Sequence, residues 1–235
     1  MIRLLRLPSG GPADAPDAAD DRLAEDAVVE RLASVLEAGG VALMPTDTVY
    51  GLAAAATADG VGALAEIKGR DADKPVAVLV ATPSAGLGLF DRPSASLVRL
   101  AEAAWPGPVT LVALAGSAAP PAMRSEGTVG VRCPDYRLVR RVAERVGPMA
   151  VTSANPAGAE PLRSLDGLEE LARRWPELRS VGCAVDGGPL PGTASTVVLV
   201  PASEGGTPTV LRTGPIAEER ISRWWNGGAV GHTLQ

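Results

Sequence analysis

Short apolar runs alternate with amphipathic segments along most of this 235-residue chain. The apolar runs have the length of strands, and the segments between them repeat apolar residues at helical spacing, so the pattern indicates helices packed around a central sheet. Strands are predicted from Val41 to a stop at Pro45 and over 76–81, 109–114, 128–132, 148–152, 181–185, 195–200 and 208–212. Helices are predicted from Arg22 to the Gly39-Gly40 pair and over 59–68, 93–104, 135–146, 165–174 and 216–225. The short connections favour one α/β (α+β) domain.

The two ends of the chain differ in composition from the part between them. Residues 8–21, PSGGPADAPDAADD, are rich in Pro, Gly, Ala and Asp, a composition that need not pack. The end after Asn226 is rich in glycine. We therefore expect a flexible acidic leader over 1–21, a folded domain over 22–225 and a flexible tail over 226–235.

Composition excludes several kinds of function. The sole histidine, His232, lies three residues from the C-terminus, which argues against Ser-His-Asp and Cys-His catalysis and against most metal sites. Cys133 and Cys183 form no CxxC pair, so reduced thiols are expected and no protein-held metal. A net charge of −5 and 3% aromatic residues argue against a broad nucleic-acid or membrane surface. Without a signal peptide or an apolar run of membrane-spanning length, the protein is expected to be cytoplasmic.

Two segments in the first third of the chain combine polar groups with turn residues. PTDTVYGL, residues 45–52, carries two hydroxyls and a carboxylate at a strand exit. It suits a ligand, but equally an Asx or ST turn in which Asp47 or Thr48 binds its own backbone. Lys68, Arg70 and Lys74 lie close together next to a Gly and a Pro. They suit a triphosphate, or simply the C-terminal end of a helix.

Two further segments lie in the last third of the chain. Thr152, Ser153 and Asn155 follow a predicted strand, where open α/β sheets bind ligands and where plain turns also occur. The glycine-rich stretch from Asp186 to Thr196 could present N–H groups to an anion or serve as an ordinary connection. Neither a Walker A nor a GxGxxG pattern is present, so any nucleotide site is of another kind.

Together these segments resemble the threonylcarbamoyl-AMP synthase family, which has a YrdC-like domain. PTDTVYGL, KGR followed by KP, WPGPVTLV, TVGVRCP, SAN, GTASTVV and VLRTGP occur in the family's order, from about Gly40 to Pro215. The resemblance implies a single α/β domain with a twisted mixed sheet flanked by helices and a concave cationic groove. It also implies the short, single-domain form of the family.

The resemblance also implies a reaction. ATP, L-threonine and bicarbonate would give threonylcarbamoyl-AMP and pyrophosphate, with Mg²⁺ accompanying ATP, so the protein would be a nucleotidyltransferase. A downstream threonylcarbamoyl transferase would then modify position 37 of tRNAs that read ANN codons. By position, Lys68, Arg70, Ser153 and Asn155 match the family's catalytic KxR–SxN set. The positions that match ATP-binding residues are Arg70, Lys74, Thr128, Ser153 and Arg212. Those that match threonine-binding residues are Thr48, Arg132, Thr152 and Ser195.

Some positions depart from the family pattern, and two other functions stay open. Leu79 stands where some members have a His that contacts threonine, and Pro161 replaces a frequent serine on the ATP side. One alternative is a YrdC-like protein that handles a carbamoyl-adenylate, as in the maturation of hydrogenases. The other is a non-catalytic RNA-binding protein of the same fold.

Overall fold

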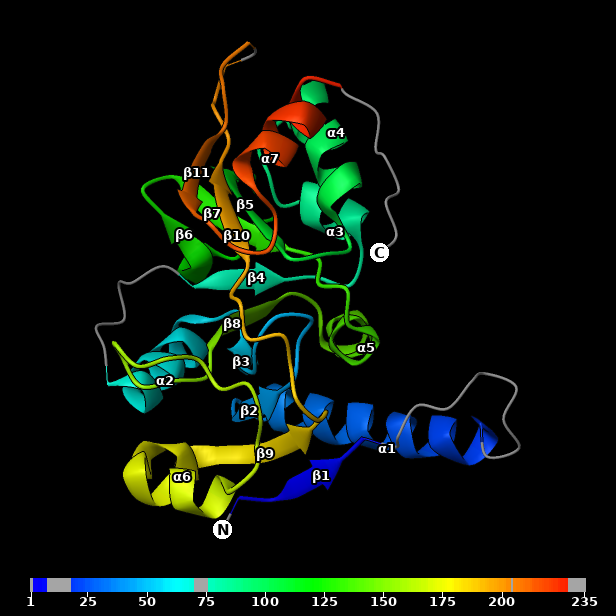
Figure 1. Ribbon diagram of the computed structural model, residues 1–235, viewed down its shortest axis with the longest axis vertical. Helices are drawn as coiled ribbons and strands as arrows, with labels where there is room; N and C mark the ends of the chain where they lie inside the picture. Colours follow the sequence, from blue (N-terminus) through cyan, green and yellow to red (C-terminus); the bar gives the residue numbers. More distant parts are fainter. Residues whose placement is uncertain (1, 8–17, 70–75, 204, 228–235) are drawn as a thin grey trace.

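The computed structural model describes residues 2–7, 18–69, 76–203 and 205–227. Within them, eleven strands form one twisted mixed sheet with helices on its two faces (Figure 1). The sheet order is β1-β9-β2-β3-β8-β4-β7-β5-β10-β11, with β6 paired to β7. The strands are β1 Leu4–Arg6, β2 Val41–Met44, β3 Gly51–Ala55, β4 Ala77–Leu79, β5 Val109–Leu114, β6 Arg124–Ser125, β7 Thr128–Arg132, β8 Met149–Ser153, β9 Val181–Asp186, β10 Thr196–Leu199 and β11 Thr209–Arg212.

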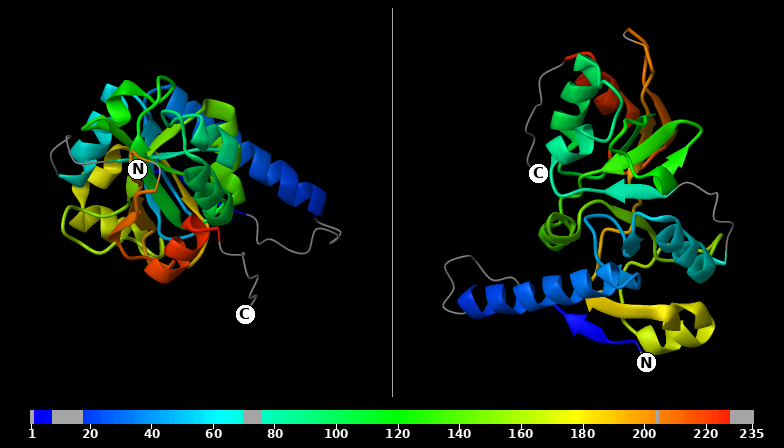
Figure 2. Two further views of the ribbon diagram at one scale, coloured as in Figure 1. Left: turned by 90° about the horizontal axis from the view of Figure 1, so that it is seen from above. Right: turned by 180° about the vertical axis from the view of Figure 1, so that it is seen from behind.

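Seven α-helices and two short 3-10 helices are described around this sheet. They are α1 Ala18–Glu37, α2 Ala58–Lys68, α3 Pro83–Leu87, α4 Ala95–Ala104, α5 Arg137–Val146, α6 Leu168–Arg174, α7 Glu218–Trp225, η1 Pro121–Met123 and η2 Pro176–Ser180. The two helix pairs α1–α5 and α4–α7 each pack side by side (Figures 1 and 2). The single α/β domain expected from the sequence is confirmed.

The two faces of the sheet pack against different helices. On one face, Val78, Val131, Leu111 and Val198 are neighbours on adjacent strands and form a row of one apolar core with residues of α2, α4 and α7. On the other face, α1 and α5 bury a second core against β2, β3, β8 and β9. Beyond these strands the second face opens into a cavity. Because side chains alternate along a strand, one face can support a core while the other lines a ligand site.

The register identifies the floor of this cavity. Leu79, Arg132, Thr110 and Val197 are cross-strand neighbours on β4, β7, β5 and β10, and all four side chains line the cavity. A second row, two residues along each strand, consists of Ala77, Gly130, Val112 and Leu199. The floor is therefore mostly apolar: Arg132 and Thr110 are the two polar side chains among the residues of these two rows, and Arg132 is their only cation.

Most predicted elements are present, with ends that match or differ by up to three residues, but the described residues 2–7 and 18–21 differ from the expected leader. Leu4–Arg6 forms β1, which pairs in parallel with β9, and Leu5 and Leu7 pack against the second core. The first helix begins at Ala18, four residues before Arg22. A strand of three residues is too short to show a period, so the sequence did not indicate it. Residues 8–17 and 228–235, which complete the predicted leader and tail, lie outside the described residues.

Candidate active site

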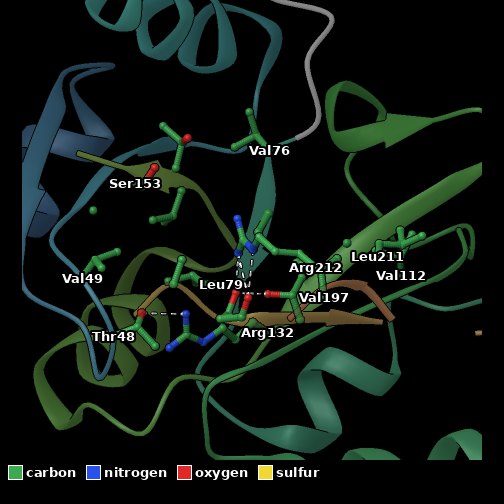
Figure 3. A pocket seen from close by; sticks show the side chains of 18 of the residues that line it. Thr48, Val49, Val76, Leu79, Val112, Arg132, Ser153, Val197, Leu211 and Arg212 are labelled. Carbon is green, nitrogen blue, oxygen red and sulfur yellow. Dashed lines mark hydrogen bonds between the residues drawn. The ribbon is translucent and has the colours of Figure 1, made fainter. Parts of the chain in front are cut away.

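Residues from β3 to β8, β10 and β11 and from the adjoining loops line a cavity of about 840 Å³ (Figure 3). All the predicted site residues that the structure describes contribute to its lining. They are Thr48, Lys68, Thr128, Arg132, Thr152, Ser153, Asn155, Ser195 and Arg212. The other two predicted residues, Arg70 and Lys74, lie outside the described part of the chain. The structure thus gathers in one place side chains that are up to 164 positions apart in the sequence, from Thr48 to Arg212.

The segment after β2 is held by a hydroxyl turn. Thr46 Oγ1 donates to Val49 O at 2.7 Å and accepts from the backbone N–H of Thr48 at 3.1 Å. Because the Thr46 proton is used in this way, Thr48 must be the donor in the 2.9 Å contact between the two hydroxyls. The ST turn expected here is present, but Thr46 forms it rather than Asp47 or Thr48. The Thr48 hydroxyl is left with acceptor capacity only.

Arg132 ends β7 with its guanidinium almost fully enclosed. Its Nε donates to Gly107 O at 3.1 Å, Nη1 donates to Thr48 Oγ1 at 3.1 Å, and Nη2 forms an ion pair with Asp47. Burial lowers the pKa of Arg132, and the nearby Asp47 carboxylate opposes that shift. Of the five guanidinium N–H groups, these contacts use three, so one on each terminal nitrogen remains for a ligand.

Asp47 supplies the countercharge of Arg132 through Oδ1, while its buried Oδ2 has no hydrogen-bond partner among the described residues. Sequence reasoning assigned no ligand-site role to Asp47. The only signal was its place inside PTDTVYGL, between the two threonines. An aspartate in such a turn ordinarily binds its own backbone, and only the fold brings β7 close enough for an ion pair.

Lys68 joins the end of α2 to the end of β8. Its ammonium group donates to Ser153 O at 2.5 Å, to Asn155 O at 2.8 Å and to Asn155 Oδ1 at 3.0 Å. Gly69, in the left-handed region with φ of 60°, ends the helix directly after Lys68. Since the lysine side chain is 4% exposed and surrounded by acceptors, it fixes the loop after β8 as well as contributing positive charge.

Asn155 is saturated by the protein itself. Its Oδ1 accepts from Lys68 and from Ser153 Oγ at 2.6 Å, and its Nδ2 donates to Pro156 O at 2.9 Å and Ala159 O at 2.7 Å. These four contacts use its two donors and both acceptor sites. The Ser153 proton is likewise committed, so Ser153 offers lone pairs to the cavity. Three of the four residues predicted as catalytic, Lys68, Ser153 and Asn155, therefore form one hydrogen-bonded network, of which Ser153 is the most exposed member.

Arg212 stands at the end of β11, next to the loop that enters β10. Its Nε and Nη2 donate to Ser195 O at 3.0 and 2.9 Å, and Nη2 also reaches Ser195 Oγ at 3.0 Å. Ser195 Oγ lies 2.9 Å from Thr110 Oγ1 on β5. Burial lowers the pKa of Arg212, and among the described residues no carboxylate lies within ion-pair distance of it. Its charge is thus available to an anion, whereas that of Arg132 is already balanced.

The glycine-rich segment between β9 and β10 is a strap tied to the segment after β2. Gly187 N donates to Tyr50 Oη at 3.0 Å, and Gly192 N donates to Thr48 O at 2.9 Å. Tyr50 Oη in turn donates to Gly188 O at 2.8 Å, and burial raises the pKa of Tyr50 to about 12. Because these N–H groups bind the protein, they are not an anion cradle. The reading of this segment as a structural connection is the one the structure favours.

Among the described residues, no cluster of three or more His, Cys, Asp or Glu side chains has the arrangement of a metal site. Among the described helices, none combines the length and apolar character needed to cross a membrane.

Comparison with known proteins gives consistent results. The Sua5/YciO/YrdC family model, which carries the description "Telomere recombination", matches residues 34–214. The chain is 35% identical over 212 residues to a putative threonylcarbamoyl-AMP synthase of Mycobacterium tuberculosis, covering 88% of this chain and 92% of the relative. It is 33% identical over 202 residues to the threonylcarbamoyl-AMP synthase of Homo sapiens, covering 79% of this chain and 64% of that protein. The crystal structure of P. abyssi Sua5 complexed with L-threonine superposes with a TM-score of 0.76 at 27% identity, covering 95% of this chain and 60% of that one.

Proposed function

Because the chain belongs to the Sua5/YciO/YrdC family, we propose that it is an L-threonylcarbamoyladenylate synthase, which makes threonylcarbamoyl-AMP and pyrophosphate from ATP, L-threonine and bicarbonate. The observation that carries the proposal is the single cavity that contains all nine described residues expected around these substrates. The relatives' names and the threonine complex of P. abyssi Sua5 support threonine and ATP as substrates. As a nucleotidyltransferase, it would supply the activated group for modification of tRNA at position 37 by a separate transferase.

Threonine fits best beside Arg132. The two remaining N–H groups of its guanidinium can bind the amino-acid carboxylate, one from each terminal nitrogen, in the fork geometry of an Arg–carboxylate pair. Thr48 contacts the same guanidinium, and Thr152 and Ser195, the residue before β10, also line the cavity. Because Asp47 already neutralises Arg132, the pocket favours a zwitterionic ligand over a plain anion.

We propose that ATP takes the rest of the cavity, whose lining includes Thr128, Ser153 and Arg212. Arg212 supplies charge for the phosphates, and we propose that Arg70 and Lys74 add to it. Mg²⁺ would enter as part of the nucleotide substrate, since magnesium usually keeps several waters and binds through substrate phosphates and one or two carboxylates. Glu126, on the cavity lining, is the carboxylate best placed to meet it.

The proposed chemistry has two steps. The amine of threonine combines with bicarbonate to give the carbamate and water. A carbamate oxygen then attacks the α-phosphorus, and the bond from that phosphorus to the pyrophosphate oxygen breaks, so pyrophosphate leaves with the electron pair. Both reactants in the second step are anions, so the cations of the cavity accelerate it by electrostatic stabilisation and positioning, without a histidine base.

The proposal is tested by pyrophosphate release with mass-spectrometric detection of threonylcarbamoyl-AMP. We expect release to require ATP, Mg²⁺, bicarbonate and threonine together. Equal turnover without threonine would overturn the proposal and favour a protein that handles a carbamoyl-adenylate or hydrolyses ATP. Absence of turnover together with a tRNA gel shift would favour the RNA-binding alternative.

A further inference from the structure

Three glycines line the cavity, and the fold accounts for two of them. Gly158 has φ of 82°, a conformation that L side chains rarely adopt. A Cβ at Gly51 would lie 3.0 Å from Val151 Cγ1, tighter than ordinary contact. At these two positions glycine is what the backbone and the packing require.

Neither the backbone conformation nor the packing requires a glycine at the third position, Gly130. It is in the middle of β7 and is not among the residues with positive φ. A Cβ at Gly130 would meet Thr110 Cγ2 and Val112 Cγ2 at 3.7 Å, which is ordinary van der Waals contact. Glycine weakens the interior of a strand, so folding alone favours a side chain at this position. A glycine at a position where folding alone favours a side chain indicates a close approach by a ligand.

The position of Gly130 on the cavity floor indicates which parts of the two substrates come close to it. Thr128, Gly130 and Arg132 alternate along β7 and all face the cavity, with about 7 Å between successive members. Thr128 is on the side proposed for ATP, and Arg132 is on the side proposed for threonine. Gly130 lies between them, and its cross-strand neighbour on β4 is the small Ala77. The side chains of the floor are therefore smallest where the two substrates would meet.

We propose that Gly130 keeps open the space in which the carbamate of threonine and the α-phosphate of ATP react. The inference rests on the proposed function and assigns a specificity-determining residue to it. The carbamate oxygen must come in line with the α-phosphorus and the departing pyrophosphate. A side chain at position 130 would rise from the floor into that space and hold the two substrates apart, although each could still bind at its own end.

The test compares Gly130→Ala and Gly130→Val with Gly62→Ala as the matched control. Gly62 is in α2, and a Cβ there would have no neighbour within 4 Å, so Gly62→Ala adds the same methyl group away from the cavity. We would measure kcat, the KM values for ATP and threonine, calorimetric binding of each substrate alone, and thermal unfolding. Since a misplacement of about 1 Å can cost about 100-fold in rate, we expect kcat to fall about 10-fold in Gly130→Ala and about 100-fold in Gly130→Val.

In both variants we expect each substrate alone to bind as in the parent, and Gly130→Ala to melt no lower than the parent. Gly62→Ala is expected to keep the parent kcat. An unchanged kcat in Gly130→Val would overturn the inference, as would a lower melting temperature in Gly130→Ala, which would make the glycine structural. A rise in KM for one substrate alone, at constant kcat, would also overturn it by placing Gly130 inside a single pocket. Threonine-dependent turnover by the parent tests the proposed function separately. Failure of the Gly130 inference can therefore be distinguished from failure of the proposed function.

Discussion

Arg132 and Asp47 form an ion pair whose side chains expose only 7% and 11% of their surface. Asp47→Ala leaves the guanidinium buried without its countercharge, so the free energy of unfolding should fall by about 3–5 kcal/mol. Urea denaturation at neutral pH measures the change. The exposed pair Arg92–Asp91 is a matched control, and Asp91→Ala should cost at most about 1 kcal/mol. Equal losses in the two variants would show that burial does not strengthen the inner pair.

Arg132 and Arg212 are expected to serve different substrates. Arg132→Lys keeps the charge but loses the fork, so threonine binding should weaken by about 1.5–3 kcal/mol while ATP binding changes little. Arg212→Ala should weaken ATP binding by a similar amount, because Arg212 has no acidic partner among the described residues to balance its charge. Threonine binding should fall less, since Arg212 contacts the residues expected around threonine through Ser195. Calorimetric titration of each ligand against both variants measures the split. An Arg132→Lys variant that loses ATP and threonine affinity equally would contradict the two-pocket assignment.

Lys68 is expected to matter for stability as well as for activity. Lys68→Met would leave Ser153 O, Asn155 O and Asn155 Oδ1 without their shared donor, at a cost of about 2–3 kcal/mol in the free energy of unfolding. Ser153→Ala removes one hydrogen bond from the same network and should cost about 1 kcal/mol. Chemical denaturation with activity measured in parallel gives both quantities. A fully stable but inactive Lys68→Met variant would mean that the lysine acts only on the ligand.

Tyr50 should make the protein less stable at alkaline pH. Burial raises the pKa of Tyr50 from 10.0 to about 12, so the folded state keeps its proton while the unfolded state loses it. This stabilisation is fully present below pH 10 and is lost as the pH rises to about 12, with a magnitude on the order of 2 kcal/mol. Unfolding of the parent and of Tyr50→Phe over this range measures it. The variant should be less stable at neutral pH and show a flatter alkaline dependence; parallel curves would refute the assignment.

The strand β1 should stabilise the edge of the sheet. Leu5 packs against the second core, whereas its neighbour Leu4 is 40% exposed. Leu5→Ala should therefore lower the free energy of unfolding by roughly 1–2 kcal/mol, and Leu4→Ala should change it by less than about 0.5 kcal/mol. Thermal melts of the two single variants provide the comparison. Indistinguishable melting temperatures would mean that β1 contributes no packing.

The elements that were predictable from sequence are those with long or regular patterns. The apolar run of β5, Val109–Leu114, and the amphipathic α5, Arg137–Val146, were both expected from periodicity. β3, GLAAA, was missed because small residues give no alternation between apolar and polar positions. β1 and β6 were missed because three and two residues are too few to show a period.

The membership of the site was predictable, but its internal contacts were not. The ordered motifs identified Lys68, Ser153, Asn155, Arg132 and Arg212, and the fold brings all of these to one cavity. The pairing of Arg132 with Asp47 depends on β7 lying opposite the segment after β2, which is a property of the sheet order. The saturation of Asn155 depends on the path of the loop as far as Ala159. Such contacts are set by tertiary structure, and local residue patterns do not encode them.

The strap between β9 and β10 has a consequence for how the chain assembles. These two strands are consecutive in sequence, yet β2, β3, β8, β4, β7 and β5 lie between them in the sheet. Contacts between distant parts of a chain are slow to form, because loop-closure entropy must be overcome before they can stabilise anything. β11, which carries Arg212 and completes the lining of the cavity, is also synthesised after the other described strands. The ligand site is therefore complete only late in folding, and ligand binding indicates that both halves of the sheet have already paired.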